Sequence, residues 1–424
     1  MIVHVVGAGV AGLSAALALH RAKAGIRVIL HEAAPHAGGR CRSWIDRRLG
    51  TEIDNGTHAV LGANTAVLRH VAQIGTDDEI HWLPDGPRMV WPARGATWTL
   101  GGPGDLVRVW RQLDGRAARE VATALRLLLP VGPSTVGARL ARGGALADAV
   151  WDPLTRAVMN TPASRADAGA FARVLRMTLL RGAAAMRMGV ARTSLGRCFV
   201  DPALDLLRAQ GAEVRFGARL RAISGAETGK TGLAFSSGPV ELRPEDRVIL
   251  ALPPWELDSL IPGLAPPWTE SPIVNLHVRL DGSRASGTRE PRMTGLVGTA
   301  AEWVLDRGDV ASVTASAAMD LAAMDAPDLA ALLWRDVAPV LGCPGMALPG
   351  TWRIVKERRA TPLQTPEFAT ARRALLGRGG HRLPASPILA GDWTLPDLPC
   401  TIETALRSGA AAATRIMTEA ARAL

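Results

Sequence analysis

The sequence predicts an α/β protein in which a domain built on a parallel sheet is interleaved with a second domain of mixed helices and strands. Two observations lead to this fold class. Residues 2–32 contain a short apolar strand, a glycine-rich turn, an Ala- and Leu-rich helix and a second strand. Segments of the same kind return in the middle and at the end of the 424-residue chain. A chain of this length is sufficient for two domains with a large core.

The first segment has the spacing of a dinucleotide-binding βαβ unit. The expected strand Ile2–Val6 enters the loop Gly-Ala-Gly-Val-Ala-Gly, and the helix after it extends to about residue 24. A second strand at residues 27–30 leads to Glu32. A GxGxxG loop alone is a weak signal, but strand, loop, helix, second strand and terminal acid in this order are typical of dinucleotide binding.

Each position in this loop has a physical role. Gly7 permits the tight turn, Gly9 lets the backbone approach a pyrophosphate, and Gly12 allows helix and strand to pack closely. Free N–H groups at the helix N-terminus attract phosphate. The Glu32 carboxylate is placed to accept hydrogen bonds from ribose hydroxyls and would repel a 2′-phosphate. The nucleotide is therefore expected beside Gly7, Ala8, Gly9, Ala11, Gly12, Glu32 and Ala33.

Composition narrows the function further. The formal net charge of +10 is carried mainly by arginines that are spread along the chain without a recognition motif, so no nucleic acid is expected as a partner. The four cysteines are scattered without metal-ligand spacing, which predicts reduced thiols, a cytoplasmic protein and no metal site. We expect neither a signal peptide nor a spanning helix. Because the chain lacks tyrosine, no tyrosine can be a catalytic acid.

The rest of the chain alternates between segments of two kinds. Helices are expected near residues 64–74, 105–113, 117–129, 146–158, 199–208 and 402–421. Strands are expected near residues 91–92, 98–100, 211–216, 218–223, 248–252, 273–280, 310–315 and 387–392. The Ala-rich face of the last helix suits close packing on a sheet. We assign residues 1–85, 193–262 and 384–424 to the nucleotide domain, and residues 86–192 and 263–383 to a substrate domain that faces the membrane.

After the βαβ unit comes a glycine pair followed by Arg40, which resembles flavoproteins of the glutathione-reductase/amine-oxidase type. Gly39 lets the loop lie against a cofactor, and Arg40 offers a planar fork to phosphate or carboxylate. The three-piece layout resembles the superfamily of flavin amine oxidases, phytoene desaturases and protoporphyrinogen oxidases. That resemblance implies a Rossmann-type domain with non-covalent FAD. It also implies FAD contacts with Gly56, Leu220 near the adenine, Gly391 and Asp392 near the ribityl chain, and Ile402 at a helix aimed at the flavin.

Several longer motifs resemble one subgroup, the squalene-associated FAD-dependent desaturases, or hydroxysqualene dehydroxylase family, of hopanoid synthesis. These motifs are Asp-Asn-Gly-Thr-His at 54–58, Trp-Asp-Pro-Leu at 151–154, Phe-Ala-Arg-Val-Leu at 171–175, Ile-Val-Asn-Leu-His at 273–277 and Gly-Asp-Trp-Thr at 391–394. The resemblance implies reductive removal of the allylic hydroxyl of hydroxysqualene, and association with the upstream enzymes of the pathway. Thr404 departs from the family, where Gly commonly follows the Ile-Glu pair.

The reaction needs a group that helps hydroxide to leave. His58 is the first candidate, although it is equally compatible with a structural role. Glu403 is the second, and its carboxylate could instead cap its own helix. Asp54 is the third and the most compatible with a structural role. A long isoprenoid also needs an apolar tunnel. Candidates for its lining, each of which could be ordinary core, are Trp91, Trp98, Trp151, Trp303, Phe171, Met177, Met186 and Met188.

The stretch from Ala170 to Val200 (residues 170–200) contains six arginines, no acid, and interleaved apolar residues. This composition is typical of a peripheral contact with the inner face of the cytoplasmic membrane, or of a solvated basic face over a core. Two other functions remain open at this point. One is an isoprenoid desaturase of the same superfamily, and the other is a non-enzymatic isoprenoid-binding protein on this fold, like the prenyl-GTPase escort proteins.

Overall fold

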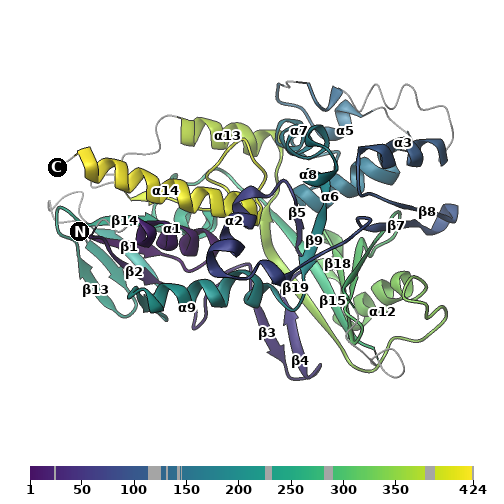
Figure 1. Ribbon diagram of the computed structural model, residues 1–424, viewed down its shortest axis with the longest axis horizontal. Coiled ribbons are helices and arrows are strands. Elements are labelled where there is room, and N and C mark those ends of the chain that lie inside the picture. The colour runs from purple at the N-terminus through teal and green to yellow at the C-terminus, as the bar shows by residue number, and fades with distance from the viewer. Residues whose placement is uncertain are drawn as a thin grey trace.

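A computed structural model describes residues 1–22, 25–112, 126–129, 132–140, 144, 146–224, 232–280, 290–377 and 387–422. The molecule is elongated, with the nucleotide-type segments towards one end and a larger sheet with its helices towards the other (Figure 1). The two chain ends lie at the same end, because α14 (Ile402–Arg422) returns towards β1 (Ile2–Val6) (Figure 1).

A five-stranded parallel sheet forms the core of the first part. Its order is β10 (Glu213–Arg215), β2 (Arg27–His31), β1, β14 (Arg247–Leu250) and β20 (Ile388–Leu389). β1 lies at the centre, where Val5 pairs with Leu30 on one side and Ile249 on the other. The sheet therefore joins strands from the start, middle and end of the chain, and the predicted α/β fold class is confirmed.

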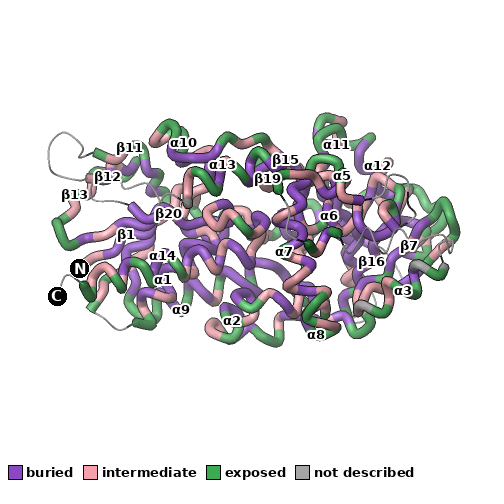
Figure 2. Tube along the Cα trace, turned by 90° about the horizontal axis from the view of Figure 1, so that it is seen from above, coloured by how far each residue is buried: buried purple, intermediate pink, exposed green. Residues whose placement is uncertain are grey.

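Helices α1 (Val10–Arg21) and α14 cross in close contact. A Cβ atom built on Gly409 would lie 2.1 Å from the carbonyl oxygen of Ala11, so only glycine allows this separation. The Ala-rich face of α14 thus packs on a helix, where we expected a sheet. Figure 2 shows that the buried positions run through β1 and along α1 and α14. Helices α2 (Thr65–Ile74) and α9 (Asp201–Ala209) pack beside this pair.

The second part is built on a seven-stranded sheet. Its order is β19 (Trp352–Pro362), β15 (Glu270–Arg279), β18 (Val310–Ala315), β17 (Trp303–Asp306), β16 (Arg292–Leu296), β7 (Arg88–Trp91) and β8 (Ala96–Thr99). Every pair is antiparallel except β16 with β7. The predicted strands at 273–280 and 310–315 are confirmed as direct neighbours in this sheet.

Helices of the second part include α3 (Pro103–Gln112), α5 (Val136–Arg139), α6 (Asp152–Met159), α7 (Ala168–Met177), α8 (Ala183–Met186), α11 (Met319–Ala323), α12 (Ala326–Val337) and α13 (Pro366–Gly377). The helix expected at 146–158 is divided, because Ala147–Trp151 forms a π-helical turn before α6. A second π-helical turn, Gly196–Val200, precedes α9. Most of the helix expected at 117–129 lies outside the described residues.

Three smaller sheets were not predicted in full. An antiparallel hairpin joins β3 (Ser43–Asp46) and β4 (Thr51–Asp54). A second sheet has the order β5 (Ala59–Leu61), β9 (Met188–Ala191) and β6 (Ile80–Trp82). A third, with β11 (Leu220–Ser224), β12 (Gly232–Phe235) and β13 (Gly238–Glu241), covers the first part beside α10 (Pro254–Leu260).

Candidate functional site

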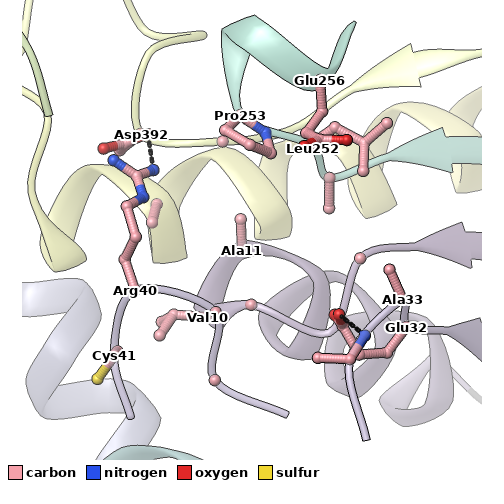
Figure 3. A pocket seen from close by; sticks show the side chains of 18 of the residues that line it. Val10, Ala11, Glu32, Ala33, Arg40, Cys41, Leu252, Pro253, Glu256 and Asp392 are labelled. Atoms are coloured by element: carbon pink, nitrogen blue, oxygen red, sulfur yellow. Dashed lines mark hydrogen bonds and ion pairs between the residues drawn. The ribbon is translucent and has the colours of Figure 1, made fainter. Parts of the chain in front are cut away.

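A groove runs along the carboxyl ends of β1, β2, β14 and β20, the edge at which open parallel sheets bind ligands. Figure 3 shows Glu32 and Arg40 at opposite ends of it, with Val10 and Ala11 between them. The structure brings most of the predicted residues into its wall. These are Gly7, Gly9, Ala11, Glu32, Ala33, Gly39, Arg40, His58, Leu220, Gly391, Asp392 and Ile402.

The three loop glycines are required for two different reasons. Gly7 has a φ of +105°, and a Cβ there would lie 2.4 Å from the carbonyl oxygen of Ala251. A Cβ on Gly12 would lie 1.8 Å from the carbonyl oxygen of Gly7. A Cβ on Gly9 would meet no described atom within 4 Å and would project into open space. The protein itself therefore excludes side chains at Gly7 and Gly12, whereas Gly9 leaves room for a ligand.

Glu32 lies at one end of the groove. Its carboxylate accepts hydrogen bonds of 2.8 Å from the backbone N–H groups of Ala8 and Ala34. Ala8 and Gly12 are buried behind the groove wall, so Ala8 contributes through its backbone alone. Among the described residues, no side chain caps the N-terminus of α1, which leaves N–H groups available to an anion.

The other end is fixed by an ion pair between distant segments. Arg40 Nη2 lies 2.8 Å from Asp392 Oδ1, and Nη1 donates to the carbonyl of Ala360 at 2.9 Å (Figure 3). Burial acts to lower the pKa of Arg40, but Asp392 outweighs it and the pKa is raised. Gly391 has a φ of +150° and donates its N–H to Ser408 Oγ at 3.0 Å, which ties the Asp392 turn to α14.

Comparison with known proteins identifies the family of the chain. A model of the flavin-containing amine oxidoreductases matches residues 10–417. The chain belongs to this family. It is a flavin-dependent oxidoreductase, and the groove has the strand-end position, open glycine and terminal acid that suit a flavin dinucleotide.

Curated relatives match nearly the whole chain. The hydroxysqualene dehydroxylase of Zymomonas mobilis is 34% identical over 97% of this chain and 98% of its own. Those of Rhodopseudomonas palustris and Sinorhizobium fredii are 36% and 35% identical, each over 98% of both chains. A putative protoporphyrinogen oxidase from Exiguobacterium and putrescine oxidase bound to putrescine share the fold, each with a TM-score of 0.68, 17% identity and 99% of both chains covered.

His58 lies in the wall of the flavin groove and is half-buried. Burial, and then the positive charge of Arg40, lower its pKa to about 4. The imidazole is therefore neutral near pH 7, and it can offer one N–H as a hydrogen-bond donor without a net charge.

The structure commits Glu403 to a different role from the catalytic one we expected. Its carboxylate accepts hydrogen bonds from the N–H groups of Ala66 and Val67, at distances of 2.9 to 3.1 Å, and pairs with Arg407 at 2.6 Å. It thus caps α2, a helix 337 residues away, and neither caps its own helix nor lines the groove. The oxygens of Glu403 are occupied and its side chain is buried, which favours a structural role over a catalytic one.

Asp54 is also committed to structural contacts. Its Oδ1 accepts hydrogen bonds from Ser43 Oγ at 2.6 Å and from the N–H of Leu195 at 2.8 Å. Its Oδ2 lies 3.2 Å from Arg307 Nη2. The carboxylate therefore ties β4 to three other segments, at Ser43, Leu195 and Arg307.

Three other residues that the sequence placed near a flavin are Gly56, Thr404 and Cys400, and only Cys400 lies in the groove wall. Gly56 is buried and does not line the groove; a Cβ on it would lie 3.5 Å from Asn275 Nδ2. Thr404 also lies outside the wall, because its hydroxyl donates to the carbonyl of Pro399 at 2.7 Å. Cys400 does line the groove, and burial raises the pKa of its thiol to about 12.

Sequence reasoning missed part of the wall. Ala251, Leu252 and Pro253 follow β14, and the rule that ligands bind at the carboxyl ends of parallel strands could have found them. Trp255 and Glu357 carry no comparable signal. Trp255 lies on α10 with its ring centroid 5.5 Å from the Arg40 guanidinium, and Glu357 pairs with Arg42 at 3.4 Å.

The apolar residues proposed for a tunnel are brought together in the second part of the molecule. Trp91, Trp98, Trp151, Trp303 and Phe171 are all buried in one cluster, and Met188 packs against it. Met177 and Met186 are half-buried. Among the described atoms, the indole nitrogens of Trp98 and Trp151 have no hydrogen-bond partner.

The basic stretch at 170–200 divides into bound and free arginines. Arg176 donates to the carbonyl of Leu128, Arg192 to that of Asp78, and Arg197 pairs with Glu52, while Arg187 lies over the ring of Trp82. Arg173 and Arg181 are exposed. In the described part of the chain, no helix combines the length and the apolar character that crossing a membrane requires.

Proposed function

We propose that this flavoprotein binds FAD non-covalently and reduces hydroxysqualene to squalene. The observation that carries the proposal is similarity over 97–98% of the chain to three proteins that share the name hydroxysqualene dehydroxylase. The groove at the strand ends supports the FAD part of the proposal.

The dinucleotide would lie along the groove from Glu32 to Asp392. Glu32 would accept from the ribose, the open space at Gly9 and the N-terminus of α1 would receive the pyrophosphate, and Leu220 would lie near the adenine. Asp392 and Arg40 would hold the ribityl end. Ile402 begins α14, whose positive N-terminal end stabilises negative charge beside it.

The state of the groove cysteines supports non-covalent binding. Covalent attachment to a cysteine requires a thiolate, because the thiol is a poor nucleophile. Burial raises the pKa of Cys400 to about 12 and that of Cys41 well above its usual value. Both side chains are therefore neutral thiols near pH 7.

Bound in the groove, reduced FAD would supply the hydride that replaces the hydroxyl on the substrate carbon. The C–O bond would break, a C–H bond would form, and the departing oxygen would leave as water after it gains a proton from solvent. The neutral imidazole of His58 would donate a hydrogen bond to that oxygen. Apolar residues around the hydrocarbon chain would keep water from the allylic cation on the side away from the departing oxygen.

The tryptophan-rich cluster of Trp91, Trp98, Trp151 and Trp303 would border the hydrocarbon chain of the substrate. Trp98 and Trp151 have buried indole N–H groups without a partner among the described atoms. Leaving a buried donor unpaired is costly, so a ligand that engages it is favoured. The double bonds of an isoprenoid present π-electrons that such donors can approach.

Such a substrate is membrane-soluble, and we propose the membrane contact at α7 and the turn after it. Arg176 Nη1 donates to the carbonyl of Leu128, which ties residues 128–129 to α7. Exposed apolar and basic side chains occur together in these segments, namely Leu129, Leu180, Arg173 and Arg181. Each arginine near an anionic surface contributes about 1 kcal/mol.

Charge reversal tests this contact. The double variant Arg173→Glu and Arg181→Glu should release the protein from acidic liposomes at moderate salt. Arg221→Glu, on β11 in the first part of the molecule, is the control and should co-sediment like the wild type. Equal binding of all three proteins would contradict the assignment of this contact.

The proposed reaction is tested by product analysis. Anaerobically reduced enzyme incubated with hydroxysqualene should form squalene, and the same enzyme without reductant should not. Formation of more unsaturated products from squalene or phytoene, with hydroxysqualene left intact, would show an oxidative desaturase instead.

A further inference from the structure

Two buried asparagines, Asn275 and Asn55, connect the second sheet to the groove. Asn275, on β15, is fully buried. Its Nδ2 donates to the backbone carbonyl of Asn55 at 2.9 Å, and its Oδ1 accepts from Thr314 Oγ1 at 2.7 Å. Both polar atoms of the Asn275 amide are therefore paired, Oδ1 with β18 and Nδ2 with the loop at residues 54–58.

Asn55 passes the connection on to the groove. Its Nδ2 donates to the backbone carbonyl of Arg40 at 2.8 Å, and its Oδ1 accepts from the N–H of Arg42 at 3.4 Å. Arg40 and Arg42 line the groove, as does His58, three residues after Asn55. Asn275 thus holds the backbone of the 54–58 loop, and the Asn55 side chain on that loop holds the backbone of the 40–42 segment.

The packing at Gly56 adds to this arrangement. A Cβ at residue 56 would lie 3.5 Å from Asn275 Nδ2, so the amide packs closely against the loop that carries His58. Substitution of Asn275 would leave two buried partners, Asn55 O and Thr314 Oγ1, without their hydrogen bonds, and an unpaired buried group is expensive enough to move a loop.

We propose that Asn275 is a positioning residue for the cofactor loops, holding the Arg40 and His58 segments against the flavin from the substrate side without touching the flavin itself. The proposal rests on the proposed function in that it assumes the groove holds FAD. It gives the motif at 273–277 a role at the cofactor site although β15 contributes nothing to the described groove wall.

Two neighbouring substitutions provide matched controls. Thr314→Val removes the hydrogen bond to Asn275 Oδ1 but leaves the donation to Asn55 intact. Ser312→Ala, on the same strand, removes a buried 2.9 Å hydrogen bond to His277 that does not reach the groove. Each control loses one buried hydrogen bond between the same two strands.

The experiment compares FAD dissociation constants, visible circular dichroism of bound flavin, and apoprotein melting temperatures. Asn275→Ala should weaken FAD binding about tenfold or more and change the flavin dichroism, whereas both controls should stay within about threefold of the wild type. If Asn275→Ala does not fold, Asn275→Asp serves in its place, because it keeps the acceptor for Thr314 and loses the donor to Asn55.

Equal flavin affinity and dichroism in Asn275→Ala and the two controls would overturn the proposal and leave Asn275 with a merely structural role. These readouts need no hydroxysqualene. A wild type that binds FAD but forms no squalene would therefore count against the proposed reaction and leave the test of Asn275 intact. In an active enzyme, Asn275→Ala should lower kcat with little change in KM, because Asn275 is fully buried and does not line the described groove.

Discussion

The two ends of the groove are built in different ways. The end where we propose the pyrophosphate consists of residues 7–12 and Glu32, which are close in the sequence and are shaped by contacts within one βαβ unit. The end where we propose the flavin ring is assembled from distant segments, as shown by the Arg40–Asp392 ion pair, which joins residues 352 positions apart. Local sterics thus determine the first end and long-range polar contacts the second, so substitutions should affect them differently.

The largest effect is expected at Gly12. A valine there would place its Cβ about where the carbonyl oxygen of Gly7 lies, and neither backbone can move without opening the α1–β1 packing. We expect Gly12→Val to destabilise the apoprotein by at least about 3 kcal/mol. Thermal unfolding of apoprotein measures it, and a melting temperature equal to that of the wild type would contradict the model of the loop.

Gly9→Val is the matched contrast, because its side chain would enter open space in the groove. This variant should fold with a melting temperature close to that of wild-type apoprotein, yet purify without flavin, since the side chain occupies the approach to the pyrophosphate. Absorption of the purified protein and its thermal melt give both results. A yellow Gly9→Val protein would remove this loop from the cofactor site.

At the other end, His58→Ala should retain FAD and lose about 10²- to 10³-fold in turnover, the effect of removing one hydrogen-bond donor to a developing negative oxygen. Because burial and Arg40 lower the pKa of His58 to about 4, the side chain is neutral above that pH, and its contribution should be constant between pH 6 and 8. A rate that rose tenfold for each unit of decreasing pH in this window would indicate the imidazolium form instead. Near-native turnover of the variant would give His58 a structural role.

Glu403→Gln should have the smallest effect, and on stability alone. The amide keeps one acceptor for the N-terminus of α2 but loses the charge that pairs with Arg407. We expect a loss of about 1–3 kcal/mol in unfolding free energy and unchanged turnover per bound flavin. A hundredfold loss of turnover in a normally stable variant would restore Glu403 as a catalytic acid.

The contrast between the two ends also explains which parts of the fold could be predicted. The strand Ile2–Val6 is confirmed at its predicted bounds, because apolar runs and glycine spacing act over a few residues. The hairpin of β3 and β4 was missed, since its short strands carry little periodicity and depend on contacts such as Asp54 with Arg307, 253 residues away. The length and register of β19 depend in the same way on β15.

The candidate site follows the same division. Glu32 and Arg40 reach the groove wall as the motif spacing indicates. The partner of Glu403 could not be predicted, because the sequence does not reveal that α2 begins beside its carboxylate. Glu357 comes from β19, and only the docking of the two sheets brings it to the groove, whereas Trp255 lies on α10, which directly follows the groove residues after β14.

The most direct test of the proposed function is a single turnover under anaerobic conditions. Enzyme with stoichiometrically reduced flavin is mixed with hydroxysqualene, and the oxidised-flavin absorption band and the squalene formed are followed together. We predict that the band returns with one squalene per flavin oxidised, and that squalene itself causes no change. Reduced flavin that persists in the presence of hydroxysqualene, or oxidised flavin that is bleached by squalene, would contradict the proposed reaction.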